Sequence, residues 1–524
     1  MSAEYEYILV GSGVAATLVA ETLLEANGGA SILMLEAGER IALRDRSSWW
    51  ELALRGKTPY YKTYDAEPGG DLGPAESVSM GGTKWGFRES RVRAYGGSTM
   101  HWGGWALRFQ PEDFECLKRT GRGANWPLGY GELEPWYEKA EVVLGVGGTS
   151  TDKDCPPRRG EFPLPPFPWT ANESQLADAF EANGLKPGHM PMARFSRCMT
   201  TGTCKYCPIG SRYTAQDQLD ALLARGFSGF TVKTGTPVLG LVAEKKRVTG
   251  VRYLEGGQEI TATAERVVIC AGAYESTKLL LRSKSGDWQE GVGNRYDQVG
   301  RYLVTHSMLS VQGTAPTNPH RWFQEIDFPT LMSRSWDSPA RQRDGKVFVF
   351  NNRSLPKVDL AAAMVGGKDR NKVNALAAGP RTAGLDAFIE EFGLPGNRIV
   401  LGGGTGKYGL PTMEVHFTRA PEMATTAHQV MDEMWKILAS AGYQGEQRKL
   451  QDPRGDHSTG TCRMGTSEAE SVTNRDLRVH GLENLYVCSN AVMPTVAAVN
   501  PTLTLAALSL RLGAHLASTK GGAA

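Results

Sequence analysis

Three cysteines lie close together near the middle of the chain. Cys198, Cys204 and Cys207 are separated by five and by two residues, and Pro208 follows the last of them. Compact cysteine runs that end in proline hold iron-sulfur clusters, and three thiolates could hold a [3Fe-4S] cluster. A zinc site would need a fourth ligand, and His189 is the only nearby histidine. The spacing therefore predicts an iron-sulfur cluster, with zinc and structural thiols or a disulfide as alternatives.

A second motif stands at the start of the chain. Gly11, Gly13 and Ala16 follow a short apolar run and precede a helical pattern. Small residues in such a turn let a pyrophosphate pass close to the free amides of a helix start. Glu36 ends the next apolar run, where a carboxylate would bind a ribose diol. Turn and acid together predict a dinucleotide site of the FAD type, and a glycine turn in an ordinary βαβ unit is the alternative.

The elements that must position these motifs alternate between strands and helices. Apolar, β-branched runs predict strands at 5–10 and 31–35, and a helical pattern covers 18–26 between them. Residues 231–270 alternate in polarity as a meander does, and end in a buried strand. A helix is expected at 277–282.

The second half of the chain differs in character. Residues 313–454 contain isolated strand-like runs and one clear helical pattern at 423–441. We therefore expect an α/β chain, α+β overall, with a Rossmann-like domain interrupted by an insertion. The first domain would comprise 1–312 and 455–524, including a cysteine segment at about 150–214, and the inserted domain 313–454.

Composition limits the partners. The 524 residues include 58 Lys and Arg and 56 Asp and Glu, so a net charge of +2 gives no reason to expect nucleic acid or an anionic membrane. The longest apolar stretch, 503–516, is too short and too polar to span a bilayer. The first residues lack the features of a signal peptide, so no export signal is expected. Sixty-two glycines suggest close backbone approach to a flat cofactor. Five further cysteines stand alone in the sequence: Cys116, Cys155, Cys270, Cys462 and Cys488.

Motifs along nearly the whole chain resemble the glucose-methanol-choline (GMC) oxidoreductase family. Besides the first turn they are GGSTMHWGG at 96–104, CAGAYES at 270–276, GNRYDQVG at 293–300, HSTGTCRMG at 457–465 and NPTLT at 500–504. The resemblance implies an FAD domain and a substrate domain built on an antiparallel sheet. Within the family, the chain is most similar to bacterial sugar dehydrogenase large subunits, such as glucoside 3-dehydrogenase, and to pyranose oxidases.

The resemblance assigns two catalytic residues. His457 matches the family's general base, and Asn500 matches the residue that holds the same substrate hydroxyl. A neutral imidazole suits proton removal because its pKa lies near the working pH. An asparagine can orient the hydroxyl but cannot take its proton, so His457 alone would be the base. The alternative is that His457 is one of nine histidines satisfied in the core.

The same resemblance assigns residues beside the flavin. Gly97 and Ser98 would approach the ring, and His101 and Trp102 would line it, at the place where pyranose oxidases attach FAD covalently through histidine. Met100 departs from the Ser-Thr-His-Trp pattern, so we expect non-covalent FAD. Plain packing of His101 is the alternative.

The last helix completes the expected cofactor site. Pro501 suits a helix start, and the free amides after it, beginning with Thr502, would stabilise negative charge on reduced flavin. A terminal helix without a ligand is the alternative. The remaining residues assigned to the cofactor are Val238, Ala271 and Asn490.

These interpretations predict an FAD-dependent dehydrogenase that oxidises a pyranose hydroxyl, at C3 of a glucoside. Electrons would pass through the [3Fe-4S] cluster to a cytochrome c. Related complexes imply a small partner subunit with an export signal, which would bring the folded chain to the periplasm; a cytoplasmic location is the alternative. The rival functions are a pyranose oxidase that uses dioxygen, a glucose or fructose dehydrogenase acting at another carbon, a flavoprotein lyase or hydratase, and a non-catalytic electron-transfer subunit.

Overall fold

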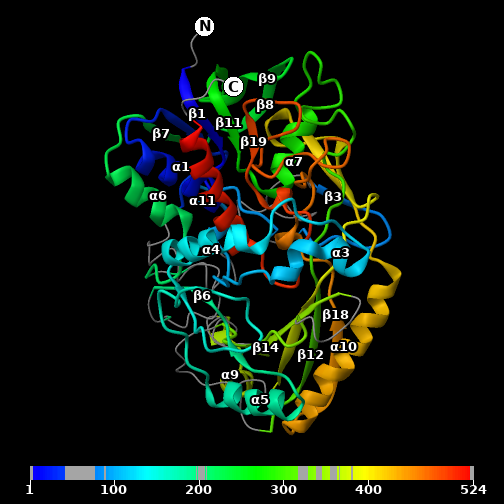
Figure 1. Ribbon diagram of the computed structural model, residues 1–524. Coiled ribbons are helices and arrows are strands. Elements are labelled where there is room, and N and C mark those ends of the chain that lie inside the picture. The colour runs from blue at the N-terminus through cyan, green and yellow to red at the C-terminus, as the bar shows by residue number, and fades with distance from the viewer. Residues whose placement is uncertain are drawn as a thin grey trace.

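The structure is a computed structural model, shown in Figure 1, with strands of both chain ends in the upper half and a long antiparallel sheet in the lower half. It describes residues 4–41, 77–87, 90–195, 198, 207, 209–316, 328–337, 345–353, 363–364, 366–378 and 382–519. Among the described helices, none combines the length and the apolar character needed to cross a bilayer.

A parallel sheet forms the centre of the upper half. Its five strands stand in the order β19-β11-β1-β2-β7, and all neighbours are parallel. They are β1 (Tyr5–Val10), β2 (Ile32–Leu35), β7 (Phe230–Lys233), β11 (Ala264–Ile269) and β19 (Leu485–Val487). Their apolar side chains are largely buried because helices cover the sheet. The expected Rossmann-like arrangement is confirmed, and residues from both ends of the chain complete it.

Two helices from opposite chain ends pack together beside this sheet. Helix α1 (Val14–Ala26) follows the glycine turn, and α11 (Thr502–Ser518) lies against it, as Figure 1 shows in blue and red. The expected meander is also present, as β8 (Val238–Glu244), β9 (Arg247–Glu255) and β10 (Gln258–Ala262). Helix α7 (Gly272–Arg282) follows β11.

The lower half is built on a six-stranded antiparallel sheet. Its order is β18-β12-β15-β14-β13-β5, and α10 (Pro421–Ser440) and α5 (Ala171–Ala182) pack in the same hydrophobic core (Figure 1). The strands are β5 (Gly188–His189), β12 (Ser307–Thr314), β13 (Leu331–Ser333), β14 (Val347–Arg353), β15 (Thr382–Ile389) and β18 (Gln444–Leu450). Strand β12 spans the expected limit at residue 313, and β5 joins from far upstream. The domain limits stay a prediction.

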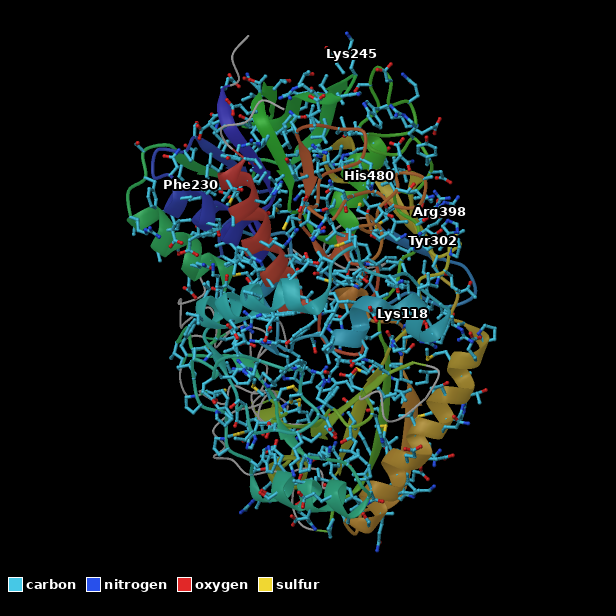
Figure 2. The ribbon with its side chains drawn as sticks, in the orientation of Figure 1. Lys118, Phe230, Lys245, Tyr302, Arg398 and His480 are labelled. Atoms are coloured by element: carbon cyan, nitrogen blue, oxygen red, sulfur yellow. The ribbon has the colours of Figure 1, made fainter. Side chains whose placement is uncertain are left out.

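A smaller sheet ties the two halves together. Strand β17 (Pro411–His416) pairs with β16 (Arg398–Thr405) and, in parallel, with β3 (Ser77–Met80). A further bridge joins Arg301 to Arg398, and Figure 2 shows Arg398 beside Tyr302 on that flank. Part of the segment 313–454 therefore packs with the upper half.

The remaining elements are short or connect these layers. They are α3 (Cys116–Thr120), α4 (Tyr130–Leu144), β4 (Val146–Gly147), β6 (Met192–Ala193), α6 (Ala215–Ala224) and α9 (Arg370–Ala378), with 3-10 turns at Gly97–Met100, Pro111–Glu115, Lys407–Gly409, Gly455–His457 and Asn490–Val492.

Two cysteines that are isolated in the sequence are neighbours in space. Cys270 and Cys488 directly follow the paired strands β11 and β19, and their thiols interact. Both are buried and free.

Candidate active site

One large cavity lies between the parallel sheet and the antiparallel sheet. Its volume is about 1090 Å³, slightly above the usual range for small-ligand sites. The carboxyl ends of β1, β2 and β11 open into it, which is where open parallel sheets bind ligands. Strands β14 and β15 of the antiparallel sheet supply the opposite wall.

Most of the residues expected to hold a cofactor line this cavity. They are Gly11, Gly13, Glu36, Gly97, Ser98, His101, Trp102, Val238, Ala271, Asn490 and Thr502. Ala16 is instead buried within α1, and Pro501 stands just before the first residue of α11. Their roles toward the cofactor stay predictions.

The glycines of the first turn serve the protein's own backbone as well as the cavity. Gly11 has φ 102°, and a Cβ there would lie 2.9 Å from the carbonyl oxygen of Cys270. A Cβ on Gly97, with φ 57°, would lie 2.9 Å from the Cα of Gly13. Any larger side chain would push these segments apart. Besides the expected approach to a cofactor, which stays a prediction, these glycines let the segments pack on one another.

Glu36 is fixed at the end of β2. Its carboxylate accepts hydrogen bonds from the Ser12 amide at 3.0 Å, the Ser12 hydroxyl at 2.7 Å and the Gly38 amide at 2.8 Å. Burial raises the pKa of Glu36 above its usual value, and these three hydrogen bonds offset only part of that rise. The result is a rigid acceptor beside the glycine turn.

A group of basic side chains lines the same part of the cavity. Arg91, Arg93, Lys278 and Arg282 surround Glu275, and the salt bridges from Arg91 and Lys278 measure 3.3 and 3.1 Å. Burial alone raises the pKa of Glu275, but these cations together hold it below its usual range. Four cations against one half-buried carboxylate favour a bound anion such as a pyrophosphate. The sequence analysis missed this group because its members are scattered along the chain.

FAD fits these residues. The cavity is large, its glycine turn and Glu36 lie beside the basic group, and Asn490 leaves a buried side-chain oxygen without a hydrogen-bond partner. Glu36 would hold the ribose, the basic group the pyrophosphate, and His101 and Trp102 the ring system.

His457 lies deeper in the cavity, in the turn Gly455–His457. Its Nε2 is 3.0 Å from Nδ2 of Asn500, and its Nδ1 is 2.9 Å from Nδ1 of His306. The side-chain oxygen of Asn500 is buried without a hydrogen-bond partner. The two residues that the family resemblance singled out are thus direct neighbours at the cavity wall.

The charges around His457 suit a base. Burial lowers the pKa of His457 to about 4, so its imidazole is neutral at neutral pH. Asp456 lies 3.7 Å from Nε2 and pairs with Arg454. Burial raises the pKa of Asp456, but Arg454 and His457 lower it by more than burial raises it. The pKa therefore lies below its usual value, and the carboxylate stays ionised. An ionised Asp456 would stabilise a positive charge on the His457 ring.

The wall opposite the glycine turn carries an aromatic pair and a polar pair. On β15, Asp386 and Phe388 point to the same face, and on β14 so do Phe350 and Asn352, because side chains alternate along a strand. The backbones of Phe350 and Asp386 stand opposite each other. Burial raises the pKa of Asp386 to about 6, although Ser310 donates a hydrogen bond to it.

Comparison with known proteins identifies the family. Two family models described as GMC oxidoreductase match residues 6–308 and 395–509. The chain belongs to the GMC oxidoreductase family. Members of this family bind FAD, so the chain is an FAD-dependent oxidoreductase that acts on CH-OH groups of sugars or alcohols.

Three relatives show the range of this similarity among GMC oxidoreductases. The fructose dehydrogenase large subunit of Gluconobacter japonicus is 27% identical over 97% of this chain and 96% of that protein. Paromamine 6'-oxidase of Streptomyces fradiae is 28% identical (97% and 90%), and C-glycoside 3-oxidase of Microbacterium trichothecenolyticum is 25% identical (98% and 97%). The crystal structure of pyridoxine 4-oxidase from Mesorbium loti has the same fold, with a TM-score of 0.66 at 20% identity over 98% of this chain and 99% of that one.

The cysteine segment of this GMC oxidoreductase is described in part. Cys198 and Cys207 are half-buried, whereas Cys204 and Pro208 lie outside the described residues. The Cys207 sulfur accepts a hydrogen bond from the amide of Ser211 at 3.3 Å, and it shares a hydrogen bond with the hydroxyl of Ser211 at 3.1 Å. Burial raises the pKa of this thiol, but these and neighbouring amide hydrogen bonds leave it below its usual value. Within the described residues no three metal-ligating side chains gather, so the cluster stays a prediction.

Sequence reasoning missed several residues of the site. His306, Asn352, Asp386, Arg454 and Asp456 all lie within the described cavity region, yet none was singled out. Asp456 directly precedes His457 and Arg454 stands three residues before it, so their closeness to the motif at 457–465 could have pointed to them. Asn352 and Asp386 are lone polar residues in apolar strands, and such residues in a buried face are a recognisable signal.

Proposed function

We propose that this GMC oxidoreductase is a dehydrogenase that oxidises a pyranose hydroxyl, at C3 of a glucoside, to the 3-keto sugar. The pairing of His457 with Asn500 at 3.0 Å carries this proposal. It puts a neutral base and an amide side by side, opposite a wall that can bind the rest of a sugar.

The residues divide the proton chemistry between them. Oxidation of the alcohol removes a hydride from carbon and a proton from the hydroxyl. Nε2 of His457 takes that proton, and Asn500 orients the hydroxyl with its amide. Asp456 stabilises the resulting imidazolium from 3.7 Å. When bound, FAD supplies the acceptor for the hydride, and the free amides that begin α11 stabilise the negative charge that follows.

The opposite wall suits a pyranose. Phe350 and Phe388 offer flat apolar faces, and Trp105 packs at the edge of Phe350 with ring centroids 4.6 Å apart. Asn352 and Asp386 offer an amide and a carboxylate to hydroxyl groups further from His457. Sugars present both kinds of surface, an apolar ring face and a rim of hydroxyls. Similarity to a fructose dehydrogenase subunit and to a C-glycoside 3-oxidase supports a sugar as the substrate, and the latter supports oxidation at C3.

The cysteine segment supports an electron route out of the site. Arg212 donates hydrogen bonds to the backbone carbonyls of Met100, at 2.6 Å, and of Trp102, which lines the cavity. Ser211, the neighbour of Arg212, contacts the thiol of Cys207. Cys207 therefore lies near the segment of Met100 and Trp102, and a [3Fe-4S] cluster with Cys207 as one of its three proposed ligands would be near the cavity. We include in the proposal a cytochrome c acceptor and a small subunit that takes the chain to the periplasm. The relative named as a large subunit supports a complex of this kind.

A second candidate is a sugar oxidase that passes electrons to dioxygen. Two of the relatives are named as oxidases, paromamine 6'-oxidase and C-glycoside 3-oxidase. In that case the cysteines would be structural.

Phenyl glucoside tests the proposal because it has no free anomeric hydroxyl. Mixed anaerobically with the FAD-loaded enzyme, it should bleach the flavin and yield a 3-keto product, and its 3-deoxy analogue should not. No turnover of phenyl glucoside, with bleaching by glucose, would overturn the C3 assignment. If neither compound bleaches the flavin, the proposal that the substrate is a sugar is overturned. Stoichiometric peroxide in air, with no cluster signal in EPR of the oxidised protein, would favour the oxidase.

A further inference from the structure

We propose that His306 is a positioning residue that holds His457 in the tautomer whose Nε2 carries a lone pair. The anchor for this arrangement is the backbone carbonyl of Ala497. The proposal rests on His457 being the base of the proposed function.

A chain of hydrogen bonds runs from the Ala497 carbonyl through His306 to His457, and the carbonyl end fixes which ring nitrogens carry hydrogen. Nε2 of His306 lies 3.2 Å from the carbonyl oxygen of Ala497, and a carbonyl oxygen can only accept. Nε2 of His306 therefore carries the hydrogen, and Nδ1 of a neutral His306 is an acceptor. The nitrogen 2.9 Å away, Nδ1 of His457, must then be the donor. This leaves Nε2 of His457 unprotonated and directed at Asn500.

The second hydrogen-bond partner of His457, Asn500, agrees with this tautomer. An unprotonated Nε2 needs a donor, and the atom of Asn500 at 3.0 Å is its amide nitrogen. The amide then keeps its second N-H and its unpartnered oxygen for a substrate hydroxyl. Both ends of the chain thus require the same tautomer of His457.

Packing holds the His306 ring in place. The side chain is fully buried just before β12. The Phe388 ring stacks on it at 5.2 Å with an interplanar angle of 16°, and the His457 ring meets it edge-on at 5.1 Å. Ala497 has φ 54°, a left-handed conformation that an alanine rarely adopts without a constraint.

His306 does not compete for the substrate proton. The titratable and charged groups that influence it are His457, Arg454 and Asp456. Burial, followed by His457 and Arg454, holds the pKa of His306 well below its usual value, although the Ala497 carbonyl and Asp456 act in the opposite direction. His306 therefore stays neutral and supplies only a lone pair. Its effect on the reaction passes through His457.

Two substitutions separate the lone pair from the volume of the ring. His306→Leu fills the site without an acceptor, and His306→Asn keeps an acceptor near the place of Nδ1. Leucine should lower the rate of anaerobic flavin reduction by sugar about 10- to 100-fold, because only the fraction of molecules in the correct tautomer reacts. Asparagine should restore the rate to within a few-fold of the unsubstituted enzyme. Equal rates for the two variants would overturn the proposal.

A spectroscopic measurement tests the tautomer without any substrate. Nitrogen-15 labelled histidine in the FAD-loaded enzyme gives signals for nine histidines, and a His457→Gln sample identifies those of His457. We expect Nδ1 of His457 to be protonated and Nε2 to be bare in the unsubstituted enzyme and in His306→Asn, and a mixture in His306→Leu. A protonated Nε2 in the unsubstituted enzyme would overturn the proposal. If no sugar reduces the flavin, the proposed function fails, while this measurement still decides the tautomer.

Both variants must retain the fold for the comparison to hold. FAD absorbance and the thermal unfolding midpoint check this. If His306→Leu fails to bind FAD, the comparison of His306→Asn with the unsubstituted enzyme still decides, because a tautomer lost in His306→Asn contradicts the proposal.

Discussion

The amide nitrogen of Asn500 lies 3.0 Å from Nε2 of His457, while the amide oxygen of Asn500 is buried without a hydrogen-bond partner. A hydroxyl that enters here can take the place of the Asn500 N-H on the lone pair of Nε2 of His457, next to an amide that can both donate and accept. Two residues 43 positions apart therefore form one binding point for an alcohol.

Removal of the Asn500 amide should weaken this binding point. For Asn500→Ala we expect the rate constant of anaerobic flavin reduction to fall about 10- to 100-fold, because a hydrogen bond to the reacting oxygen is lost. FAD affinity should not change, and stopped-flow absorbance measures both quantities. An unchanged reduction rate would show that Asn500 does not orient the substrate.

The pH profile should report the low pKa of His457. A base works only when it is unprotonated, and the pKa of His457 is lowered to about 4 by burial. We therefore expect kcat, measured at saturating sugar so that changes in KM do not enter, to stay level from pH 7 to about pH 5 and to fall as the pH drops through about 4. His457→Ala should reduce turnover about 10²- to 10⁴-fold at pH 5 and above, where the base is unprotonated in the unsubstituted enzyme. An inflection near the ordinary histidine value of 6.5 would contradict the effect of burial.

Asp386 should make substrate binding depend on pH. Burial raises its pKa to about 6, so the carboxylate, the stronger acceptor, forms above that pH. KM for a sugar should fall as the pH rises through about 6. Asp386→Asn should raise KM about 10-fold and remove this dependence. The matched control is Asp432→Asn, which removes an exposed carboxylate on α10 and should leave KM unchanged. If Asp386→Asn keeps the pH dependence of KM, that dependence belongs to another group.

Substitution of Cys207 tests the proposal that the clustered cysteines hold a [3Fe-4S] cluster. If they hold a [3Fe-4S] cluster, Cys207→Ser should lose iron and the EPR signal of the oxidised protein. Flavin reduction by sugar should persist, while reduction of cytochrome c should fall by at least tenfold. Cys155→Ser, a thiol outside the cluster motif, is the control for iron content. Full iron content in Cys207→Ser would exclude this thiol as a ligand.

A buried ion pair should contribute strongly to stability. Arg108 makes two hydrogen bonds of 2.8 Å to Glu141, and Arg158 adds one of 2.6 Å. Glu141→Ala leaves two cations without their partner, so the free energy of unfolding should fall by about 3–5 kcal/mol. The exposed pair of Lys118 (Figure 2) and Glu115 is the control, and Glu115→Ala should cost less than about 1 kcal/mol. Denaturant unfolding measures both, and equal losses would contradict the effect of burial.

Local patterns were enough to predict the elements around the cofactor. The strand at 5–10, the glycine turn and Glu36 lie within one βαβ unit, and the structure forms them as β1, α1 and β2. Such units are decided by neighbouring residues, because apolar alternation and the turn act over a few positions. The helix at 421–440 was found for the same reason.

The cavity wall formed by β14 and β15 could not be predicted from such local patterns. Asp386 and Asn352 meet only because β14 and β15 pair with a particular register, and β12 then brings His306 toward His457. Strand register depends on contacts between distant segments. A lone aspartate or histidine in an apolar run shows that a polar group is buried, but not which partner it meets.

The sequence by itself was enough to recognise the family and the dinucleotide turn, and to select His457 and Asn500 as the candidate catalytic pair. Each of these depends on residue type within a short motif. The tertiary structure alone decided that His306 and the Ala497 carbonyl stand behind His457, and that a basic group and a polar wall share its cavity. Those relationships join residues more than a hundred positions apart. Protonation states depend on such neighbours, since burial and distant charges shift a pKa by amounts that a local motif does not reveal.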